Sequence, residues 1–243
     1  MLIFGIVSNL NSQENNSILT KNIKILKKVS TDYIDGIPQD EETLTYNYND
    51  DLTLKSIITT VNNVIIETVE IEYQEGKIKK LINDFLPTKN RLKSSVIATY
   101  NYTDNLITSS TVNSNGKFAT FIFTYNTLKQ VVKEKVLTDG IFFGEKNCKY
   151  NSDGNLTKQI YSSFNLNYTH LYKSYDDKNN PFELTFSDAY LKVYNISKNN
   201  IKSSIINDNV QTYKYEYNSD NYPTKIIRKV DNKLKNITTI EYE

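Results

Sequence analysis

The sequence contains one cysteine, one histidine, one methionine and no tryptophan among its 243 residues. It therefore cannot form an internal disulfide, a cysteine and histidine metal cluster, or any site that needs two histidines. Many classes of enzyme are excluded by these absences alone. Glycine (7 residues) and proline (4 residues) are also scarce, whereas tyrosine is abundant with 19 residues.

The chain also lacks an excess of charge of either sign. Lysine and arginine total 29 against 28 acidic residues, which gives a net charge of +1. Such a chain has no field that would concentrate phosphates or anionic lipid, so we expect no nucleic-acid partner. The length allows one large β domain or two small domains, but no composition shift or linker marks a boundary.

The first residues resemble part of a bacterial secretory signal. The sequence MLIFGIVSN is apolar and gives way at once to polar residues, as an h-region does before its cleavage site. We interpret residues 1–15 as a signal peptide, truncated because no basic n-region precedes it; an apolar β-strand is the alternative. The stretch is too short for a transmembrane helix, which needs about 20 apolar residues.

A tyrosine recurs ahead of a cluster of turn-forming residues. The set is Tyr48, Tyr73, Tyr102, Tyr125, Tyr150, Tyr175, Tyr217 and Tyr242. Successive separations are 25, 29, 23, 25, 25, 42 and 25 residues, so the chain has an internal repeat of about 25 residues. We interpret the two long separations as inserted loops.

The residues before each repeat tyrosine alternate in polarity. The preceding position is always polar, and the position two before is apolar or aromatic in all but one copy, Lys173. This period of two predicts a half-buried strand with the tyrosine on its core face. Asn, Asp and Gly follow, as in Asp153-Gly154, and predict hairpin turns.

We therefore predict an all-β protein, a sequential antiparallel meander of roughly 16 to 18 strands. A sheet of that size curls, so we expect a closed or nearly closed barrel or a superhelical half-shell. Residues 20–243 are predicted to form a single β-repeat domain with a loop insertion at about 176–200. Within this insertion Ser187 could cap a short helix, and an irregular excursion is the alternative.

Three turn segments carry a resemblance to known families. YNSDGNLT from Tyr150 resembles the YD repeat of bacterial Rhs-type proteins. YDDKNNPF from Tyr175 and YNSDNYPTK from Tyr217 resemble an uncharacterised family of exported bacterial proteins and lipoproteins, described as having a porin-like fold. The YD aspartate is present only at Asp176, and no lipobox cysteine is visible. The family has no assigned catalytic residue, so the resemblance implies no active site.

Cys148 and His170 are the sole thiol and imidazole, so they are the first candidates for a nucleophilic dyad. Cys148 lies two residues before Tyr150 and shares its face. His170 lies five residues before Tyr175, an odd offset that predicts the opposite face. We therefore expect a buried, inert cysteine and a solvated histidine, with no dyad.

Two further residue sets suggest sites. Asn151, Asp153 and Asn155 alternate as in a calcium loop, but the later Gly and Glu of that loop are absent, so we interpret them as a hairpin turn. A lysine also recurs early in the second strand of the repeat, at Lys55, Lys80, Lys129, Lys158 and Lys225. These lysines could form a basic row that binds an anionic glycan or lipid, but we interpret them as a solvated face of the sheet.

The tyrosines could be a stacking surface for sugar rings, but their register favours a structural core. The structural set is Tyr48, Tyr73, Tyr102, Tyr125, Tyr150, Tyr175 and Tyr217. We predict no catalytic residue, cofactor or metal.

The sequence is most consistent with a monomeric, non-enzymatic, exported structural or ligand-binding protein of the bacterial envelope. We place it in the periplasm or on the cell surface, with a glycan or an envelope component as partner. The first alternative is an outer-membrane pore whose tyrosine face meets lipid while its charged face lines water. The second is an envelope hydrolase.

Overall fold

A computed structural model describes residues 23–88, 91–164 and 166–243. The expected signal peptide lies outside these residues. The first half of the sheet consists of β1 (Ile25–Ile34), β2 (Ile37–Tyr48), β3 (Leu54–Val61), β4 (Val64–Gln74), β5 (Lys77–Phe85), β6 (Ser94–Thr103), β7 (Leu106–Ser114) and β8 (Lys117–Tyr125). The second half consists of β9 (Val131–Thr138), β10 (Ile141–Tyr150), β11 (Leu156–Ser163), β12 (Asn167–Tyr175), β13 (Ile201–Ile206), β14 (Asn209–Tyr217), β15 (Pro223–Val230) and β16 (Lys233–Tyr242).

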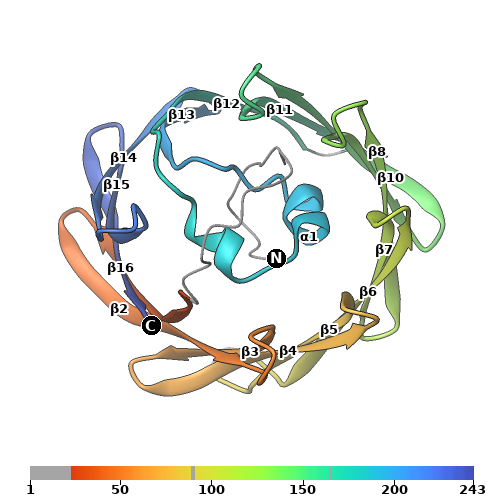
Figure 1. The fold of residues 1–243 in the computed structure, drawn as a ribbon, viewed down its shortest axis with the longest axis horizontal. Helices are drawn as coiled ribbons and strands as arrows, with labels where there is room; N and C mark the ends of the chain where they lie inside the picture. Colours follow the sequence, from red (N-terminus) through yellow and green to blue (C-terminus); the bar gives the residue numbers. More distant parts are fainter. Residues whose placement is uncertain (1–22, 89–90, 165) are drawn as a thin grey trace.

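The 16 strands of the described ranges form a closed antiparallel barrel. Each strand pairs with its neighbours in sequence, and β1 closes the ring by pairing with β16. The prediction of a sequential all-β meander is confirmed, and of the two expected shapes the barrel is the one found (Figure 1). Closure leaves the sheet with no exposed strand edge.

A bulge recurs where each repeat tyrosine meets the next strand. Tyr73 pairs with Ile78, but the preceding Glu72 pairs with Lys80, so Lys79 is an extra residue. The same shift occurs beside Tyr48, Tyr102, Tyr125, Tyr150 and Tyr217. A bulge increases local twist and bends its strand, so its repetition around the ring helps the sheet to curl closed.

The segment between β12 and β13 enters the barrel (Figure 1). It contains the 3-10 helix η1 (Pro181–Leu184) and the helix α1 (Asp188–Val193), with Ser187 at the helix N-cap but without a side-chain capping bond. Tyr190 and Val193 of α1 are 3% and 2% exposed and belong to the apolar core. The core is therefore formed by the inner face of the wall together with this segment.

Candidate functional site

The repeat tyrosines form a ring on the inner face, at the end of the barrel where β2–β3, β4–β5 and the later even-to-odd connections lie. We call this the tyrosine end. Tyr73 on β4 donates a hydrogen bond to the carbonyl oxygen of Leu54, at the start of β3, over 2.9 Å. Equivalent bonds of 2.6 to 3.0 Å to residues at or next to strand starts are made by Tyr48, Tyr102, Tyr125, Tyr150, Tyr175 and Tyr242.

These hydroxyl bonds join the two strands of each hairpin at the end away from its turn. The receiving residues are almost fully buried; Leu54 is 1% exposed and Ile78 0%. Burial raises the pKa of Tyr73 and Tyr102 to about 12, so both phenols remain protonated donors at neutral pH. The ring hydroxyls thus donate to backbone carbonyls of the wall, as the structural interpretation of the tyrosines requires.

The repeat tyrosines point into the barrel, so the orientation that we expected for an outer-membrane pore is wrong. That version placed the tyrosine face against lipid, but Tyr48, Tyr73, Tyr102 and Tyr125 pack against the internal core cluster. The outer wall carries the polar positions between them. Its members next to the tyrosine ring are Asn47, Glu72, Asn101, Thr124, Lys149, Ser174, Glu216 and Glu241.

The internal segment is fixed to the wall by polar contacts. Asn195 accepts hydrogen bonds from the Tyr150 hydroxyl at 2.9 Å and from the Cys148 thiol at 3.3 Å. The hydroxyls of Tyr194 and Tyr100 lie 3.1 Å apart, and the Tyr190 ring meets the Tyr100 ring edge-on. These contacts hold the segment against β6 and β10.

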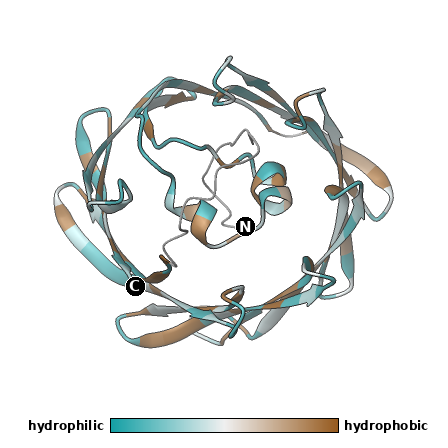
Figure 2. Cartoon of the chain, viewed as in Figure 1, coloured by the Kyte–Doolittle hydropathy of each residue, from teal (hydrophilic) through white to brown (hydrophobic). Residues whose placement is uncertain are grey.

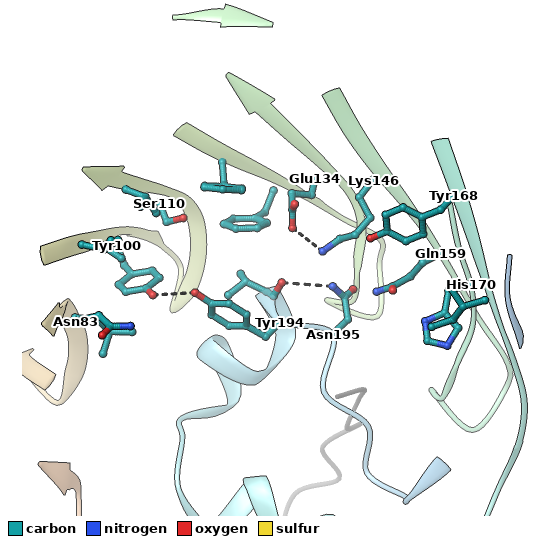
Figure 3. Close-up of a pocket in the computed structure, with 18 of the residues that line it drawn as sticks. Asn83, Tyr100, Ser110, Glu134, Lys146, Gln159, Tyr168, His170, Tyr194 and Asn195 are labelled. Atoms are coloured by element: carbon teal, nitrogen blue, oxygen red, sulfur yellow. Dashed lines mark hydrogen bonds and ion pairs between the residues drawn. The ribbon is translucent and has the colours of Figure 1, made fainter. Parts of the chain in front are cut away.

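A cavity of about 600 Å³ lies between this segment and the wall from β4 to β14. Its β4–β8 side is mainly apolar and consists of Val69, Leu81, Val96, Ala98, Val112, Phe121 and Phe123, together with Asn83, Tyr100 and Ser110. Its β9–β14 side is mainly polar and consists of Glu134, Lys146, Gln159, Tyr168, His170, Tyr172, Asn207 and Tyr213, together with Ile201 and Ile206. Figure 3 shows polar side chains from both sides pointing into this space.

Glu134 and Lys146 form an ion pair on neighbouring strands of the polar side. The carboxylate oxygen and ammonium nitrogen are 2.7 Å apart, and the side chains are only 12% and 16% exposed. Burial by itself lowers the pKa of Lys146, but the attraction of Glu134, together with smaller contributions from Cys148 and Tyr168, outweighs this effect and leaves the pKa above its ordinary value. Lys146 therefore carries its charge, and the Glu134 carboxylate 2.7 Å away balances it.

His170 also lines the cavity, which contradicts the predicted opposite face. The register of β12 shifts between Tyr172 and Ser174 and again before Tyr175, so the simple alternation is broken. His170 stacks on Tyr172 with 3.9 Å between ring centroids. Burial lowers the pKa of His170 to about 4, so the imidazole is neutral at pH 7. Its Nε2 atom is buried without a hydrogen-bond partner among the described residues.

Cys148, Gln159 and His170 occupy facing positions on three successive strands. Gln159 stands between the thiol and the imidazole, and it accepts a hydrogen bond from the Tyr172 hydroxyl at 2.8 Å. Burial raises the pKa of Cys148 to about 11, which is the opposite of an activated thiol. The arrangement brings both candidate residues to one face without making a dyad.

The other candidate sites are part of the wall or its turns. Asn151 Oδ1 accepts from the backbone N–H groups of Asp153 and Asn155, as in a turn, and no metal-ligating cluster occurs in the described ranges. Lys80 and Lys225 form cross-strand ion pairs with Glu72 and Glu216. Lys55 is the extra residue of a bulge, Lys158 pairs in register with Lys149, and Lys129 lies in a turn with φ of 58°. The lysines therefore form no single row.

The opposite end of the barrel carries exposed apolar side chains. We call it the far end; the β1–β2, β3–β4 and later odd-to-even turns lie there. Figure 2 shows apolar colour on projecting hairpins such as β3–β4 and β9–β10. Exposed apolar residues in or next to these turns include Ile34, Ile37, Val64, Ile65, Leu92, Phe118, Ile141, Phe142, Phe143, Phe164, Leu166 and Val210. Sequence reasoning did not identify this asymmetry between the ends.

Comparison with solved structures shows a shared fold. A porin-like protein from Bacteroides uniformis ATCC 8492 matches with a TM-score of 0.63 and 14% identity, over 92% of this chain and 98% of that one. A porin-like protein from Bacteroides vulgatus ATCC 8482 matches over 88% and 97% of the two chains, with a TM-score of 0.42 and 12% identity. The expected porin-like fold is thus supported. No family model matches the chain, and no curated protein is similar to it in sequence.

No helix in the described part of the chain is both long and apolar enough to cross a membrane.

Proposed function

We propose that this protein is a non-enzymatic binding protein that holds a small molecule inside its barrel. The observation that carries the proposal is the cavity of about 600 Å³ between the wall and the internal segment. Ligand sites in proteins commonly have volumes of about 300 to 1,000 Å³ and combine apolar walls with a few polar groups. A protein with a purely structural role would be expected to fill this interior with its own side chains.

The ionisable groups near the cavity favour binding over catalysis. Glu134 is neutralised by Lys146 at 2.7 Å, whereas a general acid or base exchanges its proton with substrate. The Cys148 thiol has a pKa raised to about 11 by burial. The ring of His170 stacks on Tyr172, and within the described part of the chain no ion pair joins it to a carboxylate. We therefore propose no hydrolase activity.

We further propose that the protein is exported and acts in the bacterial envelope. The signal-like residues 1–15 and the resemblance of the turns at Tyr150, Tyr175 and Tyr217 to an exported family support this placement. The shared fold with a porin-like bacterial protein is consistent with it.

A thermal-shift screen tests the binding proposal. A ligand that binds only the folded barrel raises the melting temperature with its concentration. Ala98→Phe fills part of the cavity, because Ala98 lines it on β6, and should reduce the shift. Thr99→Phe places the same ring on the outer wall and is the matched control. Equal shifts in both variants, or no saturable shift with any compound, would contradict the proposal.

The second candidate is an outer-membrane barrel. The apolar side chains at the far end, such as Ile141 (73% exposed) and Phe164 (81% exposed), favour contact with lipid. However, a membrane-spanning barrel needs an outward apolar band about 25 Å tall, and outward positions of this wall include Glu72, Lys80 and Glu216. Purification without detergent discriminates: we expect a monodisperse sample, and a strict detergent requirement would favour the pore.

A further inference from the structure

We propose that the ligand of the cavity is an uncharged amphipathic molecule, with an aliphatic or aromatic body and a head that bears hydroxyl or amide groups. The body would lie against the β4–β8 side and the head against the β9–β14 side. This inference rests on the proposed function and names the chemical class that the cavity selects.

The apolar side of the cavity selects the body. Seven apolar side chains from the five consecutive strands β4 to β8 line this side, from Val69 on β4 to Phe121 and Phe123 on β8. Contact with this surface favours apolar ligand atoms because both surfaces then leave water. Asn83, Tyr100 and Ser110 add polar groups to this side. Asn83 is 6% exposed, donates to Glu67, and has an Oδ1 atom without a partner among the described residues. Water or a hydroxyl on the body would satisfy this single acceptor.

The polar side selects the head. Tyr168, His170 and Gln159 bring hydroxyl, imidazole and amide groups to one region of the cavity (Figure 3). Tyr172 lines the same side, and its hydroxyl donates to Gln159. The buried His170 Nε2 atom has no hydrogen-bond partner in the described structure. A buried polar atom left unpaired is unfavourable, and a ligand hydroxyl or amide would supply the missing bond.

The charges around the cavity select a head without net charge. Among the described lining residues, Glu134 and Lys146 carry the charges, and they are paired with each other at 2.7 Å. An anionic or cationic head would enter without a free counter-charge, and burial of an unpaired ion is strongly unfavourable. The barrel should therefore discriminate among molecules that share a body and differ only in the charge of the head.

Four probes test this inference on the full chain by calorimetric titration below their micellar concentrations. They are monodecanoylglycerol, decanoate, decyltrimethylammonium and glycerol. We expect monodecanoylglycerol to bind at least tenfold more tightly than the two charged probes, and glycerol not to bind. Tight binding of decanoate or decyltrimethylammonium would overturn the inference while leaving the proposed function intact. Failure of all four, together with failure of the thermal-shift screen, would overturn the proposed function itself.

The variant His170→Phe tests the role of the head contact. It preserves an aromatic ring beside Tyr172 and removes the unpaired nitrogen, so the barrel should fold normally. We expect monodecanoylglycerol to bind roughly fivefold to thirtyfold more weakly, as for the loss of one hydrogen bond. Thr169→Val, on the outward side of the same strand, is the control and should bind as the parent protein does. Unchanged affinity in His170→Phe would contradict the proposed position of the head.

Discussion

Tyr217 donates its hydroxyl hydrogen bond to the carboxylate of Asp176, and not to a strand carbonyl as the other ring tyrosines do. Tyr215, on the same face of β14, instead donates a hydrogen bond to the carbonyl oxygen of Ile201 over 2.6 Å. Asp176 also accepts from the backbone N–H groups of Lys178 and Asn200 at 3.0 Å. This single aspartate therefore ties the beginning and end of the internal segment to the tyrosine end of the wall.

Removal of this carboxylate should loosen the internal segment without opening the barrel. For Asp176→Ala we expect a loss of roughly 2 to 3 kcal/mol, because four donors lose their acceptor: the Tyr217 hydroxyl, the backbone N–H groups of Lys178 and Asn200, and the side-chain amide of Asn200. Hydrogen exchange should become faster in residues 177–199 and remain slow in β6 and β7. Tyr217→Phe removes one of the donors and should cost less. Equally fast exchange in the strands of the wall would show that the segment supports the whole barrel.

Each tyrosine of the ring should stabilise the folded barrel both through its hydroxyl hydrogen bond and through the packing of its side chain. Tyr125→Phe removes the 2.6 Å bond to the Ile107 carbonyl and should cost about 1 kcal/mol. Tyr125→Ala also leaves a cavity in the core and should cost roughly 3 to 5 kcal/mol. We expect Tyr102→Ala and Tyr150→Ala to behave similarly in thermal melts. Three unchanged melting temperatures would indicate a ligand platform in place of a structural ring.

Breaking the buried ion pair of Glu134 and Lys146 should destabilise the barrel, whereas replacing both residues by apolar ones should leave its stability nearly unchanged. Lys146→Met leaves the Glu134 carboxylate buried without its partner and should destabilise the barrel by roughly 3 kcal/mol. The double variant Glu134→Leu, Lys146→Met should recover most of that loss. Lys80→Met breaks the more exposed pair with Glu72 at 2.8 Å and should cost at most about 1 kcal/mol. Urea denaturation measures all three, and a double variant that is as unstable as Lys146→Met would contradict coupling of the pair.

Stability should decrease on mild acidification because of the lone histidine. His170 has a pKa of about 4 in the folded barrel and an ordinary value of 6.5, so the unfolded chain binds the proton first. The contribution of the neutral His170 to the free energy of unfolding is complete above pH 6.5 and is lost as the pH falls toward 4. The partial exposure of the ring reduces the loss to roughly 1 to 2 kcal/mol. Urea titrations at pH 7 and pH 5 should show this difference in the parent protein and not in His170→Phe.

The single thiol should be unreactive in the native barrel. Cys148 is 5% exposed, and burial raises its pKa to about 11. Because the thiolate is the reactive form, labelling with a disulfide reagent should follow the rate of unfolding and accelerate with urea. Rapid labelling at pH 7 without denaturant would show that the barrel interior around Cys148 opens to solvent.

Much of the wall could be predicted from the sequence because its signals are local and repeated. The alternation before each tyrosine depends only on the pleat of a strand. The closing pair β1 and β16 could not be predicted in this way, since closure depends on the accumulated twist of the whole sheet. The bulge opposite each tyrosine also leaves no clear local signal, because residues as different as Lys55, Lys79 and Thr224 occupy it.

The cavity was harder to predict because it depends on departures from the repeat. The extra residue in β12 reverses the face of His170, and a strict period of two therefore gives the wrong side. Lys146 lies four residues before Tyr150 on the inner face of β10, and only the structure shows that Glu134 of β9 lies opposite it. The internal segment has ordinary loop composition, and only tertiary contacts such as that of Asn195 with Tyr150 place it inside.

Because the barrel is closed, its interior volume can differ between related barrels only by the amount that a whole added or lost hairpin contributes. A closed wall of hairpins can gain or lose only whole hairpins, since a single added strand would leave β1 unable to pair antiparallel with the last strand. Barrel diameter grows with strand number, so one more repeat would widen the interior at once along its whole length. The segment between β12 and β13 would then need to lengthen as well, because it fills part of that interior. Among barrels built in this way, the number of tyrosine repeats and the length of this segment should vary together, and both should vary with the size of the ligand that we propose.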